Sequence, residues 1–404
     1  MCAKANWSFF LAALVINALL GVLYAWSLLL VPLEQFLGVS RATISLVPSL
    51  ALLCFTTGVL IHDSVIRRVP LDVLAPCVLA FPGLGYLLFW AAPSYTALAL
   101  GYGVMFGLAG GVGFGLALAL ARETLTPPRG VIVGLVAATF AGSGMTLAAI
   151  GAALGSVEPL PRTFGLIGTC FLCGAATLGV VLRGRRFPIA QSHGHAAVGD
   201  TTRTWSFWLL FFGNFSICYA GLLFVSHGTT ILLVHGLTLS DAAWAPVLLN
   251  LGYLLGALTG GVIAARFPSR FTPMVFCTLS ALSVAVFLFD SPALMWVPSM
   301  MLIGAAFGGT VSIFMMLLHI WYGASQVGAL FGRINISYGI AGLSAPSITG
   351  WLFTKHADYN AALVLATVLL LAGSLGFILA KRPPPSSLRP DNDHRFEQGA
   401  QELP

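Results

Sequence analysis

Three apolar stretches of the sequence carry polar side chains at helical spacing that could bind a small molecule. Asn17 and Tyr24 are seven residues apart, so they lie on one face of a helix. Asn250 and Tyr253 share a face with Ala257 in another stretch. Amides and phenols have few favourable positions in a bilayer, so they face either a cavity or another helix. Interhelical hydrogen bonding is the structural alternative to lining a cavity, and the spacing leaves both open.

His227 is the only histidine well within an apolar stretch. An imidazole changes charge near neutral pH and can be cationic opposite an anion. The alternative is a neutral histidine that is hydrogen-bonded near the outer end of its helix. Asn335 and Tyr338, three residues apart, form a further pair on one helical face. The predicted substrate-binding set is Asn17, Tyr24, His227, Asn250, Tyr253, Asn335 and Tyr338.

The composition identifies the elements that must position these side chains. Of the 404 residues, 58% are hydrophobic and only 8% are charged, whereas an ordinary soluble domain has about 25% charged residues. A water-soluble enzyme is therefore excluded, and the alternating ten-residue segments of a membrane barrel are absent. The net charge of +6 comes from basic clusters between apolar runs, which is typical of orientation signals rather than of nucleic-acid binding. The sequence predicts an all-α membrane protein.

Twelve apolar runs are long enough to cross a bilayer, which requires about 20 residues. They lie near 8–31, 43–61, 71–91, 95–120, 130–155, 163–182, 205–234, 241–265, 272–290, 293–318, 328–353 and 360–380. With both termini inside, fifteen Lys and Arg residues lie on the cytoplasmic side and three on the other. This distribution predicts an integral plasma membrane protein with both termini in the cytoplasm. The bacterial inner membrane is the location that we expect for it.

The chain divides into two similar halves. Residues 1–182 form an N-terminal bundle of six helices, 183–204 a cytoplasmic linker, 205–382 a C-terminal bundle of six helices, and 383–404 a disordered tail. The run Gly58-Val59-Leu60 recurs as Gly261-Val262-Ile263 about 200 residues later, and two further matches follow at nearly the same offset. This pattern indicates two pseudo-symmetric halves, the architecture of major facilitator transporters.

Two segments carry a family resemblance. The opening Gly21-Val-Leu-Tyr24-Ala-Trp26-Ser27 with Gly38-Val-Ser40-Arg41, and the glycine-rich run 103–113, resemble the oxalate:formate antiporter and monocarboxylate porter branch of the major facilitator superfamily. The resemblance implies a secondary transporter that moves a small organic anion, a mono- or dicarboxylate, by alternating access. It is expected to be an antiporter, with uniport as the alternative, because no buried carboxylate is available for proton symport. The resemblance also implies a monomer whose partners are its substrate and the lipid bilayer.

One position departs from that branch. Its eighth span carries an arginine that binds the substrate carboxylate, and Ala257 occupies the matching position here. No Lys, Asp or Glu lies in the middle of any span. An exporter or facilitator of a neutral or amphipathic solute is therefore the alternative function.

Charged residues at the cytoplasmic ends of the predicted spans indicate a gate rather than a catalytic site. Exposed charge pairs are weak singly, but a network can bias two conformations of similar free energy. The predicted gating residues are Asp63, Arg67, Arg68, Arg266, Arg270 and Arg333. Cys170 and Cys173 form a C-x-x-C without further donors nearby, so we expect no metal, and the sequence has no nucleotide-binding or protease motif that would predict a cofactor or an enzyme.

Overall fold

The computed structural model describes residues 7–124, 136, 138–147, 149, 160–185, 202, 204–267, 270–289, 293–323 and 326–382. Every regular element in these ranges is a helix, which confirms the predicted all-α class. Most of the fifth predicted span, most of the linker and the whole tail lie outside the described residues.

Helices of the first half follow the predicted spans closely. They are α1 (Trp7–Leu20), η1 (Gly21–Ala25), α2 (Trp26–Leu37), α3 (Arg41–Arg68), α4 (Leu71–Ala91), α5 (Tyr95–Leu98), η2 (Ala99–Phe106), α6 (Gly107–Thr124) and α8 (Leu160–Val181). The first span continues to Leu37, past Pro32, which we expected to lie beyond its end. A proline is tolerated here because neighbouring membrane helices can satisfy the carbonyl group that it leaves free.

The second half repeats this arrangement. Its helices are α9 (Trp205–Val234), α10 (Leu239–Ala242), α11 (Ala245–Arg266), α12 (Phe271–Ala285), η4 (Val286–Leu288), α13 (Ala293–Tyr322), α14 (Val327–Ile334), α15 (Ile336–His356) and α16 (Asn360–Leu379). Ten helices of the described chain are long and apolar enough to cross a membrane. The eleventh predicted span is present as α14 and α15, which meet at Asn335.

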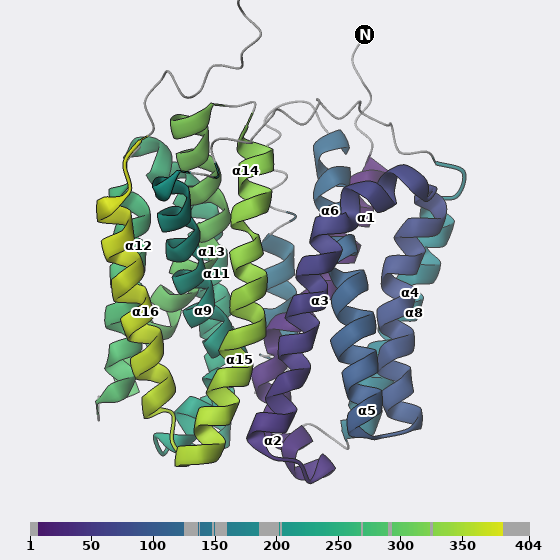
Figure 1. Cartoon of the computed structure of the whole chain (residues 1–404). Helices are drawn as coiled ribbons and strands as arrows, with labels where there is room; N and C mark the ends of the chain where they lie inside the picture. Colours follow the sequence, from purple (N-terminus) through teal and green to yellow (C-terminus); the bar gives the residue numbers. More distant parts are fainter. Residues whose placement is uncertain are drawn as a thin grey trace, which may run out of the picture.

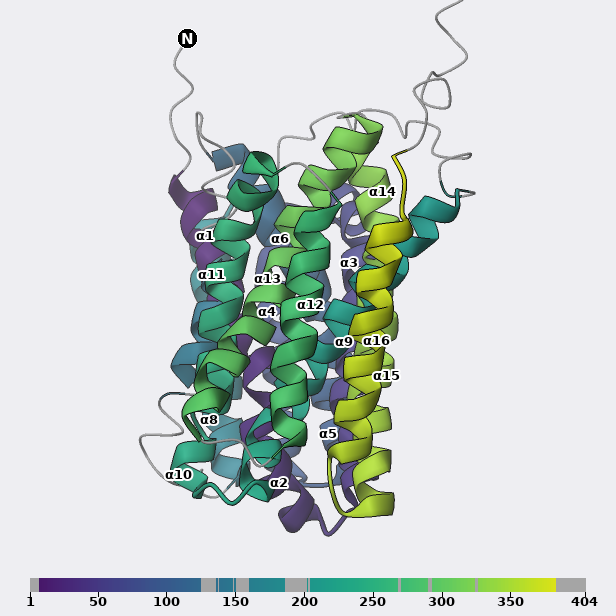
Figure 2. The same cartoon turned by 90° about the vertical axis from the view of Figure 1, so that its left-hand side faces the viewer.

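The two halves stand side by side with their long helices roughly parallel (Figure 1). In that view the purple-to-blue helices of the first half lie to the right, and the teal-to-yellow helices of the second half lie to the left. The start of α1 and the end of α16 lie at the same end of the bundle, which we call the proximal end. The opposite end, where α2, α5 and α10 lie in Figures 1 and 2, is called the distal end and is predicted to face outside.

Glycines bring pairs of helices into backbone contact at corresponding places in the two halves. In the first half, a Cβ added to Gly107 of α6 would lie 2.5 Å from the Ala51 carbonyl oxygen of α3. In the second, a Cβ at Gly308 of α13 would collide with the Tyr253 carbonyl of α11. Small residues permit such close approach in membrane helices. The duplication inferred from sequence is thus visible as two equivalent helix contacts.

The outer surface of the bundle is apolar. Leu166, Val262 and Leu294 are 69%, 70% and 83% exposed, and many other large hydrophobic side chains are also exposed. A water-soluble protein rarely exposes a continuous surface of this kind. Surrounded by lipid chains, the same side chains are in a favourable environment, as the low charge content predicts.

Candidate functional site

Five aromatic rings meet between the two halves, and we call them the central aromatic cluster. They are Tyr24, Phe140, Tyr253, Phe307 and Tyr338. The Tyr24 ring lies 5.2 Å from Phe140, 5.4 Å from Tyr253 and 5.8 Å from Phe307, measured between centroids. Phe307 stacks on Tyr338 at 6.2 Å with an interplanar angle of 4°. The Tyr24 and Tyr338 hydroxyl oxygens are 3.4 Å apart. Tyr24, Tyr253 and Phe307 each lie near the middle of their span, so the cluster lies near the middle of the bundle.

Local helix distortion places Tyr24 in the cluster. The residue lies in η1, a 3₁₀ segment that separates α1 from α2. Asn250, only 2% exposed, donates hydrogen bonds from Nδ2 to the carbonyl groups of Tyr24 at 3.3 Å and Pro246 at 2.8 Å. A side chain of the second half therefore satisfies a carbonyl group in the distorted turn of the first. Such interruptions of membrane helices are tolerated where a neighbouring helix supplies a partner.

The structure brings four residues of the predicted binding set together and places the other three elsewhere. Tyr24, Asn250, Tyr253 and Tyr338 are in contact across the two halves. Asn17 is fully buried and donates from Nδ2 to the Val136 carbonyl at 2.8 Å, within the first half. Asn335 lies at the junction of α14 and α15.

His227 is fully buried in α9 and lies towards the distal end. Its Nδ1 is 3.2 Å from the Tyr359 hydroxyl, and its Nε2 is 3.2 Å from the Pro346 carbonyl and 3.4 Å from Ser45 Oγ. A neutral imidazole satisfies these contacts, since Nε2–H donates to the carbonyl and Nδ1 accepts from the phenol. This is the hydrogen-bonded placement that the sequence left open for His227.

The central aromatic cluster contains no charged side chain. Its polar groups are the phenols of Tyr24, Tyr253 and Tyr338 and the neighbouring amide of Asn250. Ala257, one helical turn from Tyr253, occupies the position at which the resemblance to the carboxylate porters led us to expect an arginine. The fifth span contributes no Lys, Arg or His between residues 130 and 157 either. The cluster can therefore offer aromatic faces and hydrogen bonds, but no formal positive charge.

The predicted gating residues lie at or near the proximal end. Asp63 Oδ1 is 3.2 Å from Nε2 of the adjacent His62, and Arg270 donates from Nη1 to the Ala380 carbonyl at 2.6 Å. Arg333 Nη1 lies 3.4 Å from Thr202 Oγ1. Arg67 and Arg68 are in the last turn of α3, and Arg266 is in the last turn of α11. Their role as a gate remains a prediction.

Sequence reasoning did not select Phe307, Arg41 or Tyr359. In the sequence, Phe307 stands out only through the internal repeat, in which it matches Phe106 at an offset of 201. Arg41 could have been noticed, because it is one of three basic residues on the predicted outer side and Glu34 precedes it by seven positions. No sequence pattern connects Arg41 with Tyr359, which lies 318 residues away.

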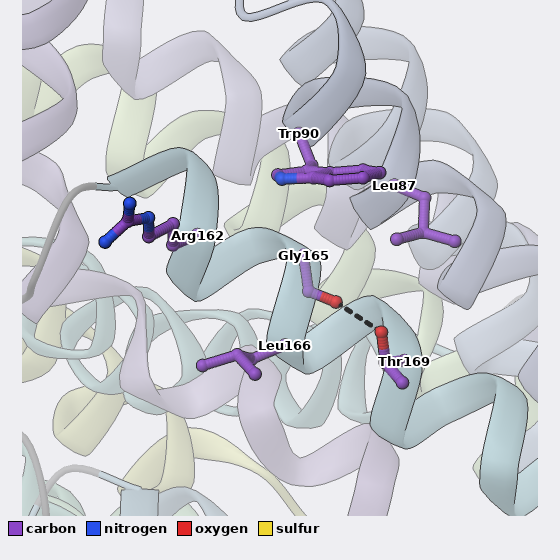
Figure 3. Close-up of a pocket in the computed structure, with 6 residues that line it drawn as sticks. All are labelled: Leu87, Trp90, Arg162, Gly165, Leu166 and Thr169. Carbon is purple, nitrogen blue, oxygen red and sulfur yellow. Dashed lines mark hydrogen bonds between the residues drawn. The ribbon is translucent and has the colours of Figure 1, made fainter.

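A separate pocket of about 320 Å³ lies between α4 and α8, within the first half (Figure 3). Leu87, Trp90, Arg162 and Leu166 line it, and Trp90 lies over Gly165 in the close-up. None of these residues contacts the second half in the hydrogen bonds or ring contacts described. Cys170 and Cys173 of α8 are exposed free thiols, and no cluster of metal-binding side chains occurs among the described residues.

Comparison with known proteins identifies the class to which this architecture belongs. The family model of the Major Facilitator Superfamily matches residues 7–320 and 211–402. The chain belongs to the Major Facilitator Superfamily, whose members are membrane transporters, so it is a transporter rather than an enzyme.

Individual relatives agree with this assignment. The chain is 24% identical over 359 residues to the "Uncharacterized MFS-type transporter YhjX" of Escherichia coli (strain K12), covering 84% of this chain and 86% of the relative. It resembles the solved structure of a bacterial homologue of the human lysosomal transporter Spinster, inward-facing and unoccupied, with a TM-score of 0.73 and 16% identity. That match covers 95% of this chain and 100% of the homologue. The occupied form has a TM-score of 0.69 and 17% identity, covering 97% of this chain and 100% of that one. At these identities the structural likeness concerns the fold alone.

Proposed function

We propose that this transporter carries a small, uncharged and amphipathic organic solute by alternating access and binds it at the central aromatic cluster. The observation that carries the proposal is a cluster of rings and phenols from both halves without a cation. A site shared by the two halves near the middle of the bundle is where transporters of this architecture bind their substrates. Aromatic walls with a few directed hydrogen-bonding groups suit a solute that has an apolar body and a polar group.

Because the central aromatic cluster has no positively charged side chain, an anion is not our first choice of substrate. Moving a carboxylate from water into a buried site without a positive partner costs at least several kcal/mol. Each 1.4 kcal/mol reduces affinity about tenfold, so such a penalty removes useful binding. In the related branch the arginine of the eighth span supplies the compensating charge, and Ala257 cannot.

A small organic anion, a mono- or dicarboxylate exchanged by antiport, is the second candidate. It is favoured by the paired hydroxyls of Tyr24 and Tyr338, which are 3.4 Å apart and can both donate to one carboxylate. Hydrogen bonds to a charged group are about twice as strong as those between neutral groups. The resemblance of residues 21–45 to the carboxylate porters points to the same class.

Thermal shift with matched pairs of ligands separates the two candidates. Benzamide against benzoate and succinamide against succinate differ in charge but little in shape. A ligand at about 100 times its dissociation constant stabilises the folded protein by about 2.7 kcal/mol. We expect the amides to raise the melting temperature and the carboxylates not to do so.

Two variants test whether a ligand that stabilises the protein binds at the central aromatic cluster. Tyr338→Phe should abolish the shift, because it removes one hydroxyl of the central pair. Tyr86→Phe is the matched control, since the Tyr86 hydroxyl is buried without a hydrogen-bond partner among the described residues. Stabilisation by carboxylates alone would establish the second candidate, and a shift unaffected by Tyr338→Phe would place the site elsewhere.

A further inference from the structure

The strongest polar contact between the two halves lies at the distal end, away from the central aromatic cluster. Arg41, the first residue of α3, is only 9% exposed. It donates from Nε to Glu34 Oε2 at 2.7 Å, and its Nη2 lies 2.6 Å from the same oxygen. Its Nη1 donates to the Tyr359 hydroxyl of the second half at 2.6 Å. The guanidinium also lies 4.4 Å from the centroid of the Phe353 ring, at cation–π distance.

Tyr359 is buried and makes hydrogen-bond contacts within the second half. The side chain is 1% exposed, and its hydroxyl lies 2.7 Å from Thr230 Oγ1 and 3.2 Å from His227 Nδ1, both in α9. Burial raises the pKa of the Tyr359 phenol above its ordinary value of 10.0, although Arg41 acts in the opposite direction. The hydroxyl is therefore protonated at neutral pH, so that it accepts from Arg41 and donates to α9.

The backbones of α3 and α15 also approach each other here. The Ala42 N–H donates to Thr354 Oγ1 at 2.9 Å. A Cβ at Gly350 would lie 2.8 Å from the Arg41 carbonyl oxygen and would also collide with the Ser45 side chain. A glycine at position 350 is thus required for α15 to reach α3 at this point.

Six hydrogen bonds between described residues of the two halves lie at the distal end or at the middle. They are Ser27–Thr229, Arg41–Tyr359, Ala42–Thr354, Ser45–His227, Tyr24–Tyr338 and Tyr24–Asn250. Alternating access requires one end of the bundle to be closed while the other is open. The contacts at the distal end must therefore break for the central cluster to become accessible from that side.

We propose that Arg41 and Tyr359 form a latch that holds the distal end closed, with Glu34 as the permanent counter-ion of Arg41. The proposal rests on alternating access as part of the proposed function. Glu34 and Arg41 belong to the same half, so the guanidinium keeps its carboxylate when the halves separate. Opening breaks one charge-assisted hydrogen bond and one cation–π contact, and it does not expose an unpaired charge. A contact of this kind is strong enough to favour one conformation and weak enough to release it.

Distance measurements across the distal end test the latch directly. Spin labels at Pro93→Cys in the first half and Leu239→Cys in the second, both at exposed positions, report whether this end is open. The full chain is used in lipid nanodiscs, with its seven native cysteines replaced by alanine. In Tyr359→Phe, which removes only the oxygen that accepts from Arg41, the ratio of long to short distances should rise at least about tenfold. Arg41→Gln should have the same effect.

Two control variants test whether any loss of a phenol oxygen or of a distal positive charge would change the distances. Tyr86→Phe removes a phenol oxygen without a partner among the described residues. Arg162→Gln removes a positive charge at the distal end, from a side chain that lines a pocket formed by residues of the first half. Both should keep the wild-type distances. A disulfide between Ala42→Cys and Thr354→Cys, added to Tyr359→Phe, should remove the long-distance population until it is reduced.

The outcome does not depend on identifying the solute, because the distances are measured without ligand. If Arg41→Gln does not fold, the distances in Tyr359→Phe are sufficient to test the latch. This variant keeps the aromatic ring, so we expect it to fold. Distances in Tyr359→Phe that match those of Tyr86→Phe would overturn the latch. A ligand screen without any binding would count against the proposed function and would leave the latch result intact.

Discussion

Two adjacent glycines in α6 allow the packing of α6 on α3 to be tested with a built-in control. A Cβ at Gly111 would collide with the Phe55 carbonyl oxygen and would lie 2.8 Å from the Val59 nitrogen. A Cβ at Gly110 would have its nearest neighbour at 3.5 Å, the Phe55 Cδ2 atom, which is an ordinary van der Waals contact. The two substitutions Gly111→Ala and Gly110→Ala add the same methyl group one position apart.

The expected difference follows from two opposing terms. Replacing glycine by alanine inside a helix stabilises it by about 0.5–1 kcal/mol, and this gain is the same at both positions. Overpacking at a tight contact destabilises by about 1–3 kcal/mol, and this loss applies only to Gly111→Ala. Gly110→Ala should therefore be at least as stable as the wild type, and Gly111→Ala should be less stable than Gly110→Ala by about 1–3 kcal/mol.

Thermal unfolding in detergent, followed by tryptophan fluorescence, measures the order of the three proteins. The predicted order of melting temperature is Gly110→Ala at or above wild type, and Gly111→Ala below both. Equal melting temperatures for the two variants would show that α3 and α6 are not in backbone contact at Phe55. The phase of α6 relative to α3 would then be different from the one described.

Three further predictions concern buried amides and the orientation of the chain. Asn250→Leu should destabilise the protein by about 1–3 kcal/mol, because the Tyr24 carbonyl loses a donor inside the bundle; an unchanged melting temperature would contradict this role. Asn214 donates from Nδ2 to Ser337 Oγ at 2.8 Å, so a double-mutant cycle with alanine at both positions should give a coupling of about 0.5–1.5 kcal/mol, and additive effects would exclude the bond. Reporter fusions should place the 183–204 linker and the C-terminus in the cytoplasm, whereas an external linker would refute the orientation drawn from the basic residues.

Composition and periodicity alone were enough to predict the class of this protein. With 8% charged residues the chain cannot cover a water-exposed surface, and helices are the only open-ended elements that satisfy every backbone group within lipid. The bounds of α4 and α9 agree with the apolar runs 71–91 and 205–234. The glycine matches between the halves predicted a duplication that reappears as equivalent helix contacts.

Part of the candidate site also followed from helical spacing. Asn250 and Tyr253 were selected because they share the face that carries Ala257, and both contact Tyr24 in the structure. Periodicity shows which side chains of one helix point the same way. It does not show which other helix lies opposite that face.

The remaining assignments depend on the tertiary structure for that reason. His227 and Tyr24 are both polar residues in apolar runs, yet one is hydrogen-bonded to Tyr359 near the distal end and the other lies in the central aromatic cluster. The contact of Arg41 with the second half depends on Tyr359, which folding brings to within 2.6 Å of the guanidinium across 318 positions of sequence. Contacts between helices are set by the packing of whole surfaces, in which glycines such as Gly111 and Gly350 determine how closely two backbones can approach.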